Sequence, residues 1–322
     1  MLAAYAARLD PNDPASALDV GERPDPVDRE NWSTVEVRAA SINHHDVWAL
    51  RGVGLPEKAL PMVLGTDAAG VAPDGTDVVV HGVVGQDGHG VGPREPRTLL
   101  SEKYPGTLAE RVSVPTANLI PKPPELSFEE AACLPTAWLT AYRMLFGAGE
   151  LSPGDRVLVQ GAGGGLTSAA IILGAAAGLE VYATSRSAEK RERALSLGAF
   201  AALEPGERLP TRVDAVVESV GRATWKHSVS SVRAGGVITV AGLTSGDPEP
   251  AELTRVFFQD LRIHGVTMGT RDDLAALLRF LVRTGVRPTI DSTVPLDRAR
   301  DGVARVVSGD HFGKVVVTPA TP

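Results

Sequence analysis

The segment from Gly161 to Thr167 contains four glycines and stands between an apolar β-branched run and an apolar helical run. Glycines permit a tight turn and let a pyrophosphate approach the backbone, and the free N–H groups at a helix start supply donors and positive potential. Strand, glycine turn and helix follow one another in the order of a dinucleotide site. We therefore expect cofactor phosphates at Gly163, Gly164, Gly165, Leu166 and Thr167.

The next β-like run, Glu180–Thr184, determines which dinucleotide is expected. A site for NAD carries a carboxylate about 20 residues beyond the glycines, where it binds the ribose hydroxyls. This chain instead has Ser185 and Arg186 there, with Lys190 one turn further on. Hydroxyl, guanidinium and ammonium groups suit a 2′-phosphate, so we expect NADP(H). The alternative is that Arg186 and Lys190 are simply the solvated start of a helix.

Length and composition limit the class of protein. The chain has 322 residues with 43% hydrophobic content, enough for two packed domains. No long apolar run or signal-peptide pattern is present, so we expect a soluble, cytoplasmic protein without membrane association. The single cysteine, Cys133, excludes a disulfide framework and an all-cysteine metal site. A net charge of −7 argues against binding to nucleic acid.

These residues need elements that position them, and the first 124 residues indicate short strands separated by turns. The expected strands are Ala3–Ala6, Ser33–Ala40, Gly70–Ala72, Asp77–His81 and Thr107–Val114. Strands without crossover helices predict a mostly antiparallel, barrel-like domain. The polar stretch between Val83 and Pro105 is too irregular for an element and is expected to be a long loop.

Helices and strands alternate in the middle of the chain. Ser127 and Glu130 form a capping-box pattern before a helix from Ala131 to Phe146, which Pro135 should kink. The further elements expected are a helix at Ser187–Leu197, strands at Val213–Glu218, Gly236–Ala241 and Arg262–Thr267, and a helix at Asp272–Thr284. This alternation predicts a Rossmann domain with a doubly wound parallel sheet. A nicotinamide would lie at the strand ends, near Ser219–Gly221 and at Gly242 and Leu243.

Several motifs carry a family resemblance in their order and spacing: Ser41–Asp46, Leu64–Gly70, Pro105–Glu110, Leu134–Tyr142, the glycine-rich loop and Phe312–Val317. Over essentially its full length the chain resembles the medium-chain dehydrogenase/reductase superfamily, in its zinc-less quinone oxidoreductase-like branch. The resemblance implies a GroES-like catalytic domain made of residues 1–124 and 269–322, and a Rossmann domain of residues 125–268. It also implies a homodimer formed through edge strands of the Rossmann domains.

The resemblance makes the question of a metal specific. Zinc-dependent members bind the catalytic ion with a thiolate, an imidazole and a second thiolate, and the matching positions here are Asn43, Thr66 and Thr136. Asp67 replaces a nearby glutamate. Since none of the three is a usual zinc ligand, we expect no metal. An unrelated site formed by His44, His45, His81 and His89 is the alternative, but scattered histidines are more often structural.

Without zinc, a hydride donor can still reduce a quinone or a polarised C=C bond if hydrogen-bond donors stabilise the developing oxyanion. The resemblance places Asn43 beside the nicotinamide ribose and His45 where zinc-dependent relatives keep a proton-relay hydroxyl. A histidine could stabilise or protonate the enolate at neutral pH, so His45 and Asn43 are the expected catalytic residues. Packing or capping is the alternative role of His45.

The remaining expected site residues belong to the cofactor or the substrate. The resemblance places Thr140, Gly269, Phe312, Gly313 and Lys314 at the cofactor, and it departs at Thr167, where the family usually has a glycine. A surface lysine is the alternative for Lys314. Trp48, Thr66, Thr136 and Phe257 are expected to line the substrate pocket, although Trp48 and Phe257 could equally be ordinary core.

Three functions follow from this sequence. The first is an NADPH-dependent, zinc-independent reductase of quinones or α,β-unsaturated carbonyls. The second is a carbonyl or alcohol oxidoreductase, or a reductase that tailors a biosynthetic product. The third is an NADPH-binding sensor or structural protein without turnover. Catalytic turnover separates the third from the first two, and the range of substrates separates the first from the second.

Overall fold

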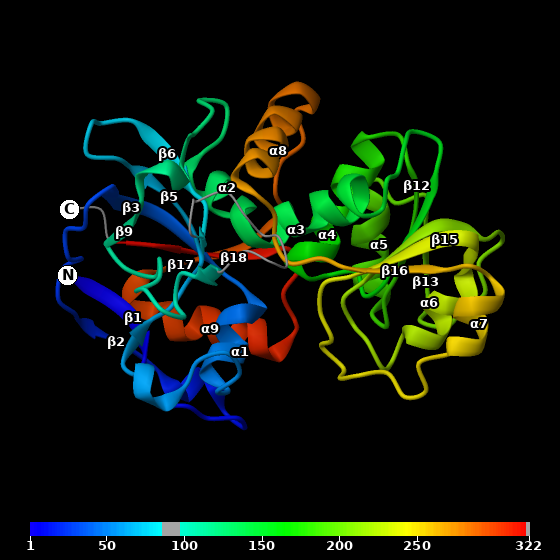
Figure 1. Ribbon diagram of the computed structural model, residues 1–322, viewed down its shortest axis with the longest axis horizontal. Coiled ribbons are helices and arrows are strands. Elements are labelled where there is room, and N and C mark those ends of the chain that lie inside the picture. The colour runs from blue at the N-terminus through cyan, green and yellow to red at the C-terminus, as the bar shows by residue number, and fades with distance from the viewer. Residues whose placement is uncertain (86–96, 320–322) are drawn as a thin grey trace. The chain divides into compact units, whose positions relative to one another are not determined.

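The computed structural model describes residues 1–85 and 97–319, which form two compact units (Figure 1). Unit 1 consists of residues 1–137 and 269–322, and unit 2 of residues 138–268. The expected domain limits share the break at residue 269 with these units, whereas residues 125–137 pack with unit 1 because helix α2 (Phe128–Ala132) contacts β3 (Trp32–Ile42) and β5 (Asp67–Val71). Within the described ranges, no helix is long and apolar enough to cross a bilayer.

Unit 1 is built on a seven-stranded sheet with two smaller sheets. Its other strands are β1 (Leu2–Ala6), β2 (Leu18–Glu22), β4 (Met62–Val63), β6 (Asp77–Val80), β7 (Val83–Gly85), β8 (Arg97–Leu99), β9 (Arg111–Pro115), β10 (Leu119–Pro121), β17 (Ile290–Pro295) and β18 (Lys314–Thr318). The large sheet has the order β10-β6-β5-β3-β18-β17, with β9 also paired to β3. All its pairs are antiparallel except β17 with β18, so the expected mostly antiparallel domain is confirmed.

Unit 1 also contains helices. They are α1 (His44–Leu50), α2, α8 (Arg271–Thr284) and α9 (Ala299–Ser308), with short 3-10 turns η1 (Pro14–Ala17), η2 (Glu57–Ala59), η3 (Thr116–Asn118) and η6 (Leu296–Arg298). Helix α9 packs on β17 and β18, and its Val303 joins Ile42 and Val315 in the core. A Cβ on Gly302 would lie 2.7 Å from Cδ1 of Ile42, so a glycine is needed where α9 approaches the sheet.

Unit 2 is a parallel six-stranded sheet in the order β13-β12-β11-β14-β15-β16. These strands are β11 (Arg156–Val159), β12 (Glu180–Thr184), β13 (Ala201–Leu203), β14 (Val213–Glu218), β15 (Val232–Val240) and β16 (Arg262–Gly265). Numbered within the unit, the order is 3-2-1-4-5-6, which is the order of a Rossmann fold. The strand order reverses between β11 and β14, and ligands of such sheets bind at the carboxyl ends of the strands there.

Helices α3 (Leu139–Tyr142), α4 (Gly165–Ala176), α5 (Ala188–Ser196), α6 (Trp225–Ser231) and α7 (Leu253–Phe258) complete unit 2. Helix α4 contacts β11 and β12, α5 contacts β12 and β13, and α6 contacts β14 and β15 (Figure 1). The core on one side includes Leu158, Tyr182, Trp225, Val229 and Ile238. The doubly wound α/β fold expected from the sequence is therefore present.

Three local expectations differ from the structure. The capping box at Ser127 and Glu130 is formed, but the helix expected as far as Phe146 alternates between α segments and π segments, η4 (Leu134–Trp138) and η5 (Arg143–Gly147). Pro135 lacks the N–H that a regular α-helix needs, and a wider turn accommodates this. The strand expected from Thr107 begins only at Arg111. The end of the expected polar loop forms β8, paired with β7, while residues 86–96, with His89, lie outside the described residues.

Candidate functional site

The glycine-rich loop follows β11 and precedes α4 at the carboxyl edge of the unit 2 sheet. Gly161 and Gly163 have φ angles of 80° and 135°, which residues with a Cβ rarely adopt. A Cβ on Gly163 would lie 2.8 Å from Cδ and 3.2 Å from Nζ of Lys190. The Lys190 side chain therefore lies against the loop.

Thr167, which departs from the family pattern, is accommodated within the loop. Its side chain is 3% exposed, and its Oγ1 lies 3.1 Å from the Gly161 carbonyl and 3.2 Å from the Gly164 carbonyl. The hydroxyl thus donates to backbone acceptors of the turn itself. Threonine at this position is therefore held by hydrogen bonds to the backbone of the loop.

The segment after β12 contains the residues expected to select the cofactor. Ser185 is buried, and Arg186 is exposed. Arg191, which the sequence did not single out, donates from Nη1 to the Ser185 carbonyl at 2.8 Å and to the Arg186 carbonyl at 3.4 Å. Its Nη2 also lies 3.2 Å from Glu204 Oε1. Arg191 therefore fixes the backbone that presents the Ser185 and Arg186 side chains.

A buried carboxylate, Glu218, organises the end of β14. It accepts hydrogen bonds from the backbone N–H groups of Val220 at 2.8 Å and Gly221 at 3.0 Å. It also accepts from the hydroxyls of Thr224 and Ser228, at 2.9 Å and 2.6 Å. Four donors to one carboxylate explain how its charge is tolerated at 0% exposure.

The network continues to the glycine-rich loop through Gln160. Its Nε2 donates to Ser228 Oγ at 3.0 Å, and its Oε1 accepts from Thr184 Oγ1 at 2.8 Å. Thr184 Oγ1 in turn accepts from the Gly161 N–H at 3.1 Å. The carboxyl ends of β11, β12 and β14 are thus tied together by buried hydrogen bonds, which rigidifies the expected cofactor site.

Unit 1 contains a second buried polar cluster, centred on Asp67 and Lys314, whose side chains are 0% and 2% exposed. Lys314 Nζ lies 3.3 Å from Asp67 Oδ2 and donates to the Ile42 carbonyl at 3.0 Å and to Asn43 Oδ1 at 2.5 Å. The three ammonium protons have three acceptors. Lys314 is therefore a buried cation with all of its hydrogen bonds made, and the interpretation of it as a surface lysine is wrong.

The other members of this cluster surround Asp67. Its Oδ2 also accepts from Ser41 Oγ at 2.9 Å and Asn43 Nδ2 at 2.8 Å, and its Oδ1 accepts from Thr136 Oγ1 at 2.5 Å. Thr66 Oγ1 lies 3.3 Å from Asn43 Nδ2 and 2.9 Å from Thr136 Oγ1. Because Asn43 donates to Thr66 and Thr136 donates to Asp67, the Thr66 hydroxyl proton is directed to Thr136.

Asp46 has a structural position at the start of helix α1. Its Oδ2 accepts from the Asn43 N–H at 2.8 Å and its Oδ1 from the Gly65 N–H at 2.9 Å. Burial raises the pKa of Asp46, although these bonds and the nearby His45 oppose the change. The side chain links the first turn of α1 to the segment that leads into Thr66 and Asp67.

His45 contacts a carboxylate that the sequence did not predict. Its Nε2 lies 3.3 Å from Glu102 Oε1, while Glu102 Oε2 accepts from the Leu99 N–H at 3.0 Å and from Thr98 Oγ1 at 3.1 Å. Burial lowers the pKa of His45, but the bond to Glu102 and the nearby acidic charges outweigh it, and the pKa lies above the usual value. His45 Nδ1 is covered from solvent and has no hydrogen-bond partner among the described residues.

The expected pocket aromatics occupy different environments. Trp48, on α1, is partly exposed, and the Arg51 guanidinium lies 5.2 Å from its ring centroid. Phe257, on α7 of unit 2, is 63% exposed and lies against Phe258, which is 77% exposed. Phe257 is therefore not ordinary core, and its assignment to a substrate pocket stays a prediction.

The remaining expected cofactor residues lie at element ends or in buried turns. In unit 2, Thr140 is buried in α3, and Leu243, next to Gly242 after β15, packs against Gly221. In unit 1, the Gly269 carbonyl lies 2.8 Å from His81 Nε2. Phe312 is buried, and Gly313 has a φ of 99° immediately before Lys314. This turn directs Lys314 from the edge of β18 into the cluster.

The structure thus brings some of the expected residues together in each unit. Asn43, Thr66, Thr136 and Lys314 meet in unit 1, and the glycine-rich loop meets Lys190 in unit 2. The contributions of Glu102 and Glu218 were missed. Glu218 ends a β-branched run, which is a signal that the sequence offered, whereas no pattern around Glu102 indicates a partner for His45.

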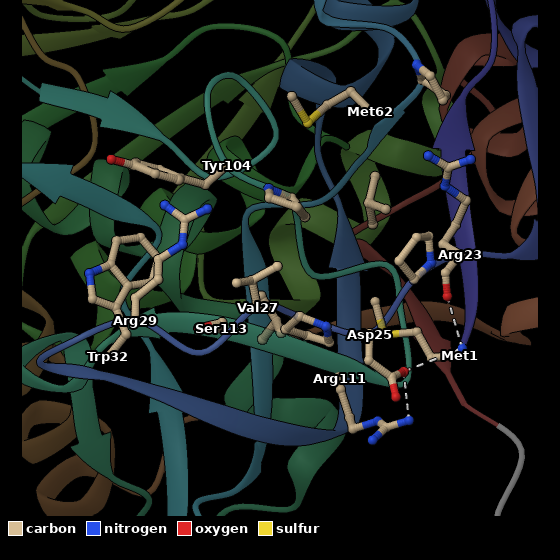
Figure 2. Close-up of a pocket in the computed structure, with 16 residues that line it drawn as sticks. Met1, Arg23, Asp25, Val27, Arg29, Trp32, Met62, Tyr104, Arg111 and Ser113 are labelled. Atoms are coloured by element: carbon tan, nitrogen blue, oxygen red, sulfur yellow. Dashed lines mark hydrogen bonds and ion pairs between the residues drawn. The ribbon is translucent and has the colours of Figure 1, made fainter.

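Unit 1 also has a surface cavity of about 260 Å³ near its first residue (Figure 2). In it, Arg29 lies 5.1 Å and 4.9 Å from the ring centroids of Trp32 and Tyr104, and Arg111 pairs with Asp25 at 2.7 Å. The cavity is lined by Met1, Arg23, Pro24, Asp25, Pro26, Val27, Arg29, Trp32, Pro61, Met62, Val63, Tyr104, Pro105, Arg111, Val112 and Ser113. It shares no residue with the expected cofactor, catalytic or substrate sites.

Comparison with known proteins identifies the class to which this fold and these sites belong. Residues 29–124 match the alcohol dehydrogenase GroES-like domain, and residues 165–283 match the zinc-binding dehydrogenase family. A solved NAD-dependent alcohol dehydrogenase is 33% identical with a TM-score of 0.90, and the match covers 99% of each chain. The protein therefore belongs to the medium-chain dehydrogenase/reductase superfamily, as the sequence motifs indicated.

Other relatives act on coenzyme A thioesters. A crotonyl-CoA reductase of Streptomyces collinus is 28% identical, over 96% of this chain and 83% of the relative. A 2-octenoyl-CoA carboxylase reductase, solved in complex with NADP and 2-octenoyl-CoA, is 26% identical with a TM-score of 0.89, over 99% of this chain and 87% of the other. The chain is an oxidoreductase of the medium-chain dehydrogenase/reductase type.

The description of one matching family names zinc, so the donor set must be tested against that ion. Zinc in proteins is held by thiolates, imidazoles and carboxylates. At the positions that the family resemblance matches to the zinc ligands, the chain has an amide and two hydroxyls, which hydrogen-bond to one another and to Asp67. The Lys314 ammonium already neutralises that carboxylate. These residues do not fit a catalytic zinc ion, and the described residues contain no group of three or more histidines, cysteines or acids placed to hold a metal.

Proposed function

We propose that the protein is an NADPH-dependent, zinc-independent reductase that transfers a hydride to an α,β-unsaturated carbonyl or a quinone. The observation that carries this proposal is the cluster of unit 1, where Asn43, Thr66 and Thr136, which the resemblance matches to zinc ligands, hydrogen-bond to one another and to the Asp67–Lys314 pair. Reduction of a simple ketone places the developing charge on one carbonyl oxygen, which a Lewis acid would stabilise. A conjugated acceptor spreads the developing charge and needs only hydrogen-bond donors.

The preference for NADP(H) rests on the segment after β12. A bound nicotinamide dinucleotide supplies the hydride, while the protein binds its phosphates and orients its ring. Ser185, Arg186 and Lys190 provide a hydroxyl and two cations where an NAD site has a carboxylate. Lys190 already lies against Gly163, and Arg191 fixes the backbone at Ser185 and Arg186. The solved 2-octenoyl-CoA relative in complex with NADP supports this choice.

In this proposal the two units divide the chemical work. The glycine-rich loop and the donors after β12 hold the dinucleotide, and His45 of unit 1 donates the proton that completes the reduction. Asn43 is held in one orientation by Lys314 and Asp67, so its remaining role is to position the cofactor or the substrate. The crotonyl-CoA and 2-octenoyl-CoA relatives favour an enone or an enoyl thioester as the acceptor, and the quinone rests on the sequence resemblance.

An alcohol or carbonyl oxidoreductase is the second candidate, because the solved structure with 33% identity is an NAD-dependent alcohol dehydrogenase. Trp48, Thr66, Thr136 and Phe257 stay the proposed substrate-pocket residues for either reaction. A small-molecule substrate, a cytoplasmic location, a homodimer and the lack of a nucleic-acid or membrane partner also belong to the proposal.

The test is oxidation of NADPH by the purified protein with an ortho-quinone, a para-quinone, an enone, an enal, an enoyl-CoA and a simple ketone. We expect turnover of conjugated acceptors with NADPH, weaker turnover with NADH, and no effect of a metal chelator. Loss of activity on chelation would contradict zinc independence. Turnover of the ketone alone would favour the second candidate, and tight NADPH binding without any turnover would favour a sensor.

Cofactor choice has its own control within the same assay. Arg186→Ala and Lys190→Ala remove cations expected at the 2′-phosphate, so each should raise KM for NADPH about tenfold or more and leave KM for NADH nearly unchanged. Arg193→Ala is the matched control. It also removes a cation from helix α5, which carries Lys190, but Arg193 is not one of the residues expected to bind the phosphate. Equal losses with both cofactors would contradict the assignment of the 2′-phosphate site.

A further inference from the structure

Glu102 is held in place independently of His45. Its Oε2 accepts from the Leu99 N–H and from Thr98 Oγ1, both contributed by β8. This leaves Oε1 to face His45 Nε2 at 3.3 Å. A carboxylate fixed by two donors on one oxygen presents its other oxygen in a defined direction, as a positioning group must.

The histidine is also fixed. His45 lies in the first turn of α1, which the bonds of Asp46 to Asn43 and Gly65 anchor. With Nε2 directed to Glu102, the second ring nitrogen is Nδ1, which is buried and makes no hydrogen bond within the described parts of the chain. A buried N–H without an acceptor is costly unless a ligand satisfies it.

The charged groups around His45 favour its protonated form. Glu102, Asp46 and Asp67 are the titratable groups that act on the ring, and all three are acidic. Glu102 makes the direct contact, while Asp46 and Asp67 are engaged by backbone donors and by the Lys314 cluster. An ion pair with a fixed carboxylate favours the imidazolium form and also fixes which ring nitrogen is free.

We propose that Glu102 is a positioning residue that holds His45 as an imidazolium with Nδ1–H free to protonate the reduced substrate. This inference rests on the proposed reductase function and deepens it. The hydride brings the electron pair of the new C–H bond at the β-carbon, and the π pair of the C=C bond shifts toward the carbonyl oxygen to give an enolate. The Nδ1–H bond of His45 then breaks as the new bond to hydrogen forms on the enolate. Neutral His45 regains a proton from solvent, and Glu102 stays ionised throughout.

The first measurement is the titration of His45 by NMR with ring-labelled histidine, assigned by the loss of its signal in His45→Gln. Glu102→Gln should lower the pKa of His45 by about one pH unit, because the variant removes the charge but keeps an acceptor for the Leu99 N–H. Thr98→Val is the matched control, since it removes one bond to Glu102 and keeps the charge, so its His45 should titrate close to the wild type. An unchanged pKa in Glu102→Gln would overturn the proposal.

The second measurement is the pH dependence of kcat with NADPH and a turned-over enone. An acid that must be protonated loses activity as the pH rises through its pKa, so the loss in Glu102→Gln should occur at a lower pH than in the wild type. A purely structural role of Glu102 would lower kcat without changing the pH at which activity is lost, and that result would overturn the proposal. Absence of turnover in the wild type would instead overturn the reductase function, whereas the NMR shift would still report the pairing of His45 with Glu102.

Discussion

Lys314 donates its three protons to the Ile42 carbonyl, Asn43 and Asp67 inside unit 1. Its position explains how a buried polar cluster is stabilised where the resemblance places the catalytic zinc ion of other members. The ammonium supplies the positive charge, Asp67 balances it, and the Thr136 hydroxyl donates to the second oxygen of the carboxylate. The balance depends on both partners, since a single buried charge is far more costly than the pair.

A single substitution should expose this dependence. Lys314→Met would leave Asp67 buried and unpaired, and we expect the free energy of unfolding to fall by about 3–5 kcal/mol. The double variant Lys314→Met with Asp67→Asn should be less destabilised than the sum of the single variants, because neither partner is left charged. Urea unfolding of the four proteins measures both effects. Additive losses would contradict a coupled pair.

The sequence predicted the members of this cluster better than their bonds. Asn43, Thr66 and Thr136 were expected in one site because they lie in motifs that resemble the family's, and hydrogen bonds link them in the structure. The contact between Asp67 and Lys314 spans 247 positions and depends on how β18 pairs with β3, which no local pattern reports. Glu102 was missed for the same reason, because its role appears only when β8 lies near α1.

At the scale of elements, the segment that carries Lys314 is fastened by Asp291 of β17. The Asp291 carboxylate is 4% exposed and accepts from Arg305 of α9 at 2.8 Å and 3.1 Å and from the Phe312 N–H at 2.9 Å. It thereby joins β17, α9 and the turn that precedes β18. Burial raises the pKa of Asp291, but the bonds from Arg305 and Phe312 outweigh this and bring the pKa to about 2.

Asp291→Asn should therefore lower stability in a pH-dependent way. A lowered folded-state pKa stabilises the protein above the unfolded value of about 4 and loses that effect as the pH falls toward 2. We expect the variant to lose about 1–3 kcal/mol of unfolding free energy at pH 7 and to converge with the wild type in acid. Denaturant unfolding at several pH values measures this. A constant difference down to the lowest pH that keeps the protein folded would contradict it.

Elements were predicted where the local pattern is decisive. Strand β14 has the expected limits, Val213–Glu218, because a β-branched run between turn residues leaves little choice. The helix around Pro135 was predicted as one kinked element, whereas the backbone alternates between α and π turns. Packing decides how the backbone of a helix adjusts to the hydrogen bond that proline cannot donate, and the local sequence pattern does not report that packing.

At the scale of the whole molecule, the outer edge of unit 2 carries exposed apolar side chains. All four residues of β16, the edge strand of the six-stranded sheet, are exposed. Leu253, Phe257 and Phe258 of α7 are 67%, 63% and 77% exposed, and Ile263 of β16 is 45% exposed. Edge strands and exposed apolar side chains are both features that proteins commonly cover.

The proposed homodimer would use this edge. We expect sedimentation analysis to give a dimer for the wild type and a monomer for Ile263→Lys, because a charge on an edge strand opposes pairing with a second copy. Phe200→Lys, at another exposed aromatic residue of unit 2, is the control and should stay dimeric. A monomeric wild type would contradict the dimer, and a dimeric Ile263→Lys would place its interface elsewhere.

The position of β18 has a consequence for biosynthesis. This strand lies between β3 and β17 in the large sheet of unit 1, yet the ribosome makes it after the whole of unit 2. A nascent chain can therefore complete the Rossmann unit while β3 still lacks its neighbour, leaving an open sheet edge that other chains could capture. Strand β18 also brings Lys314 to Asp67. Unit 1, whose synthesis begins first, therefore acquires this buried charge pair only after unit 2 has been made.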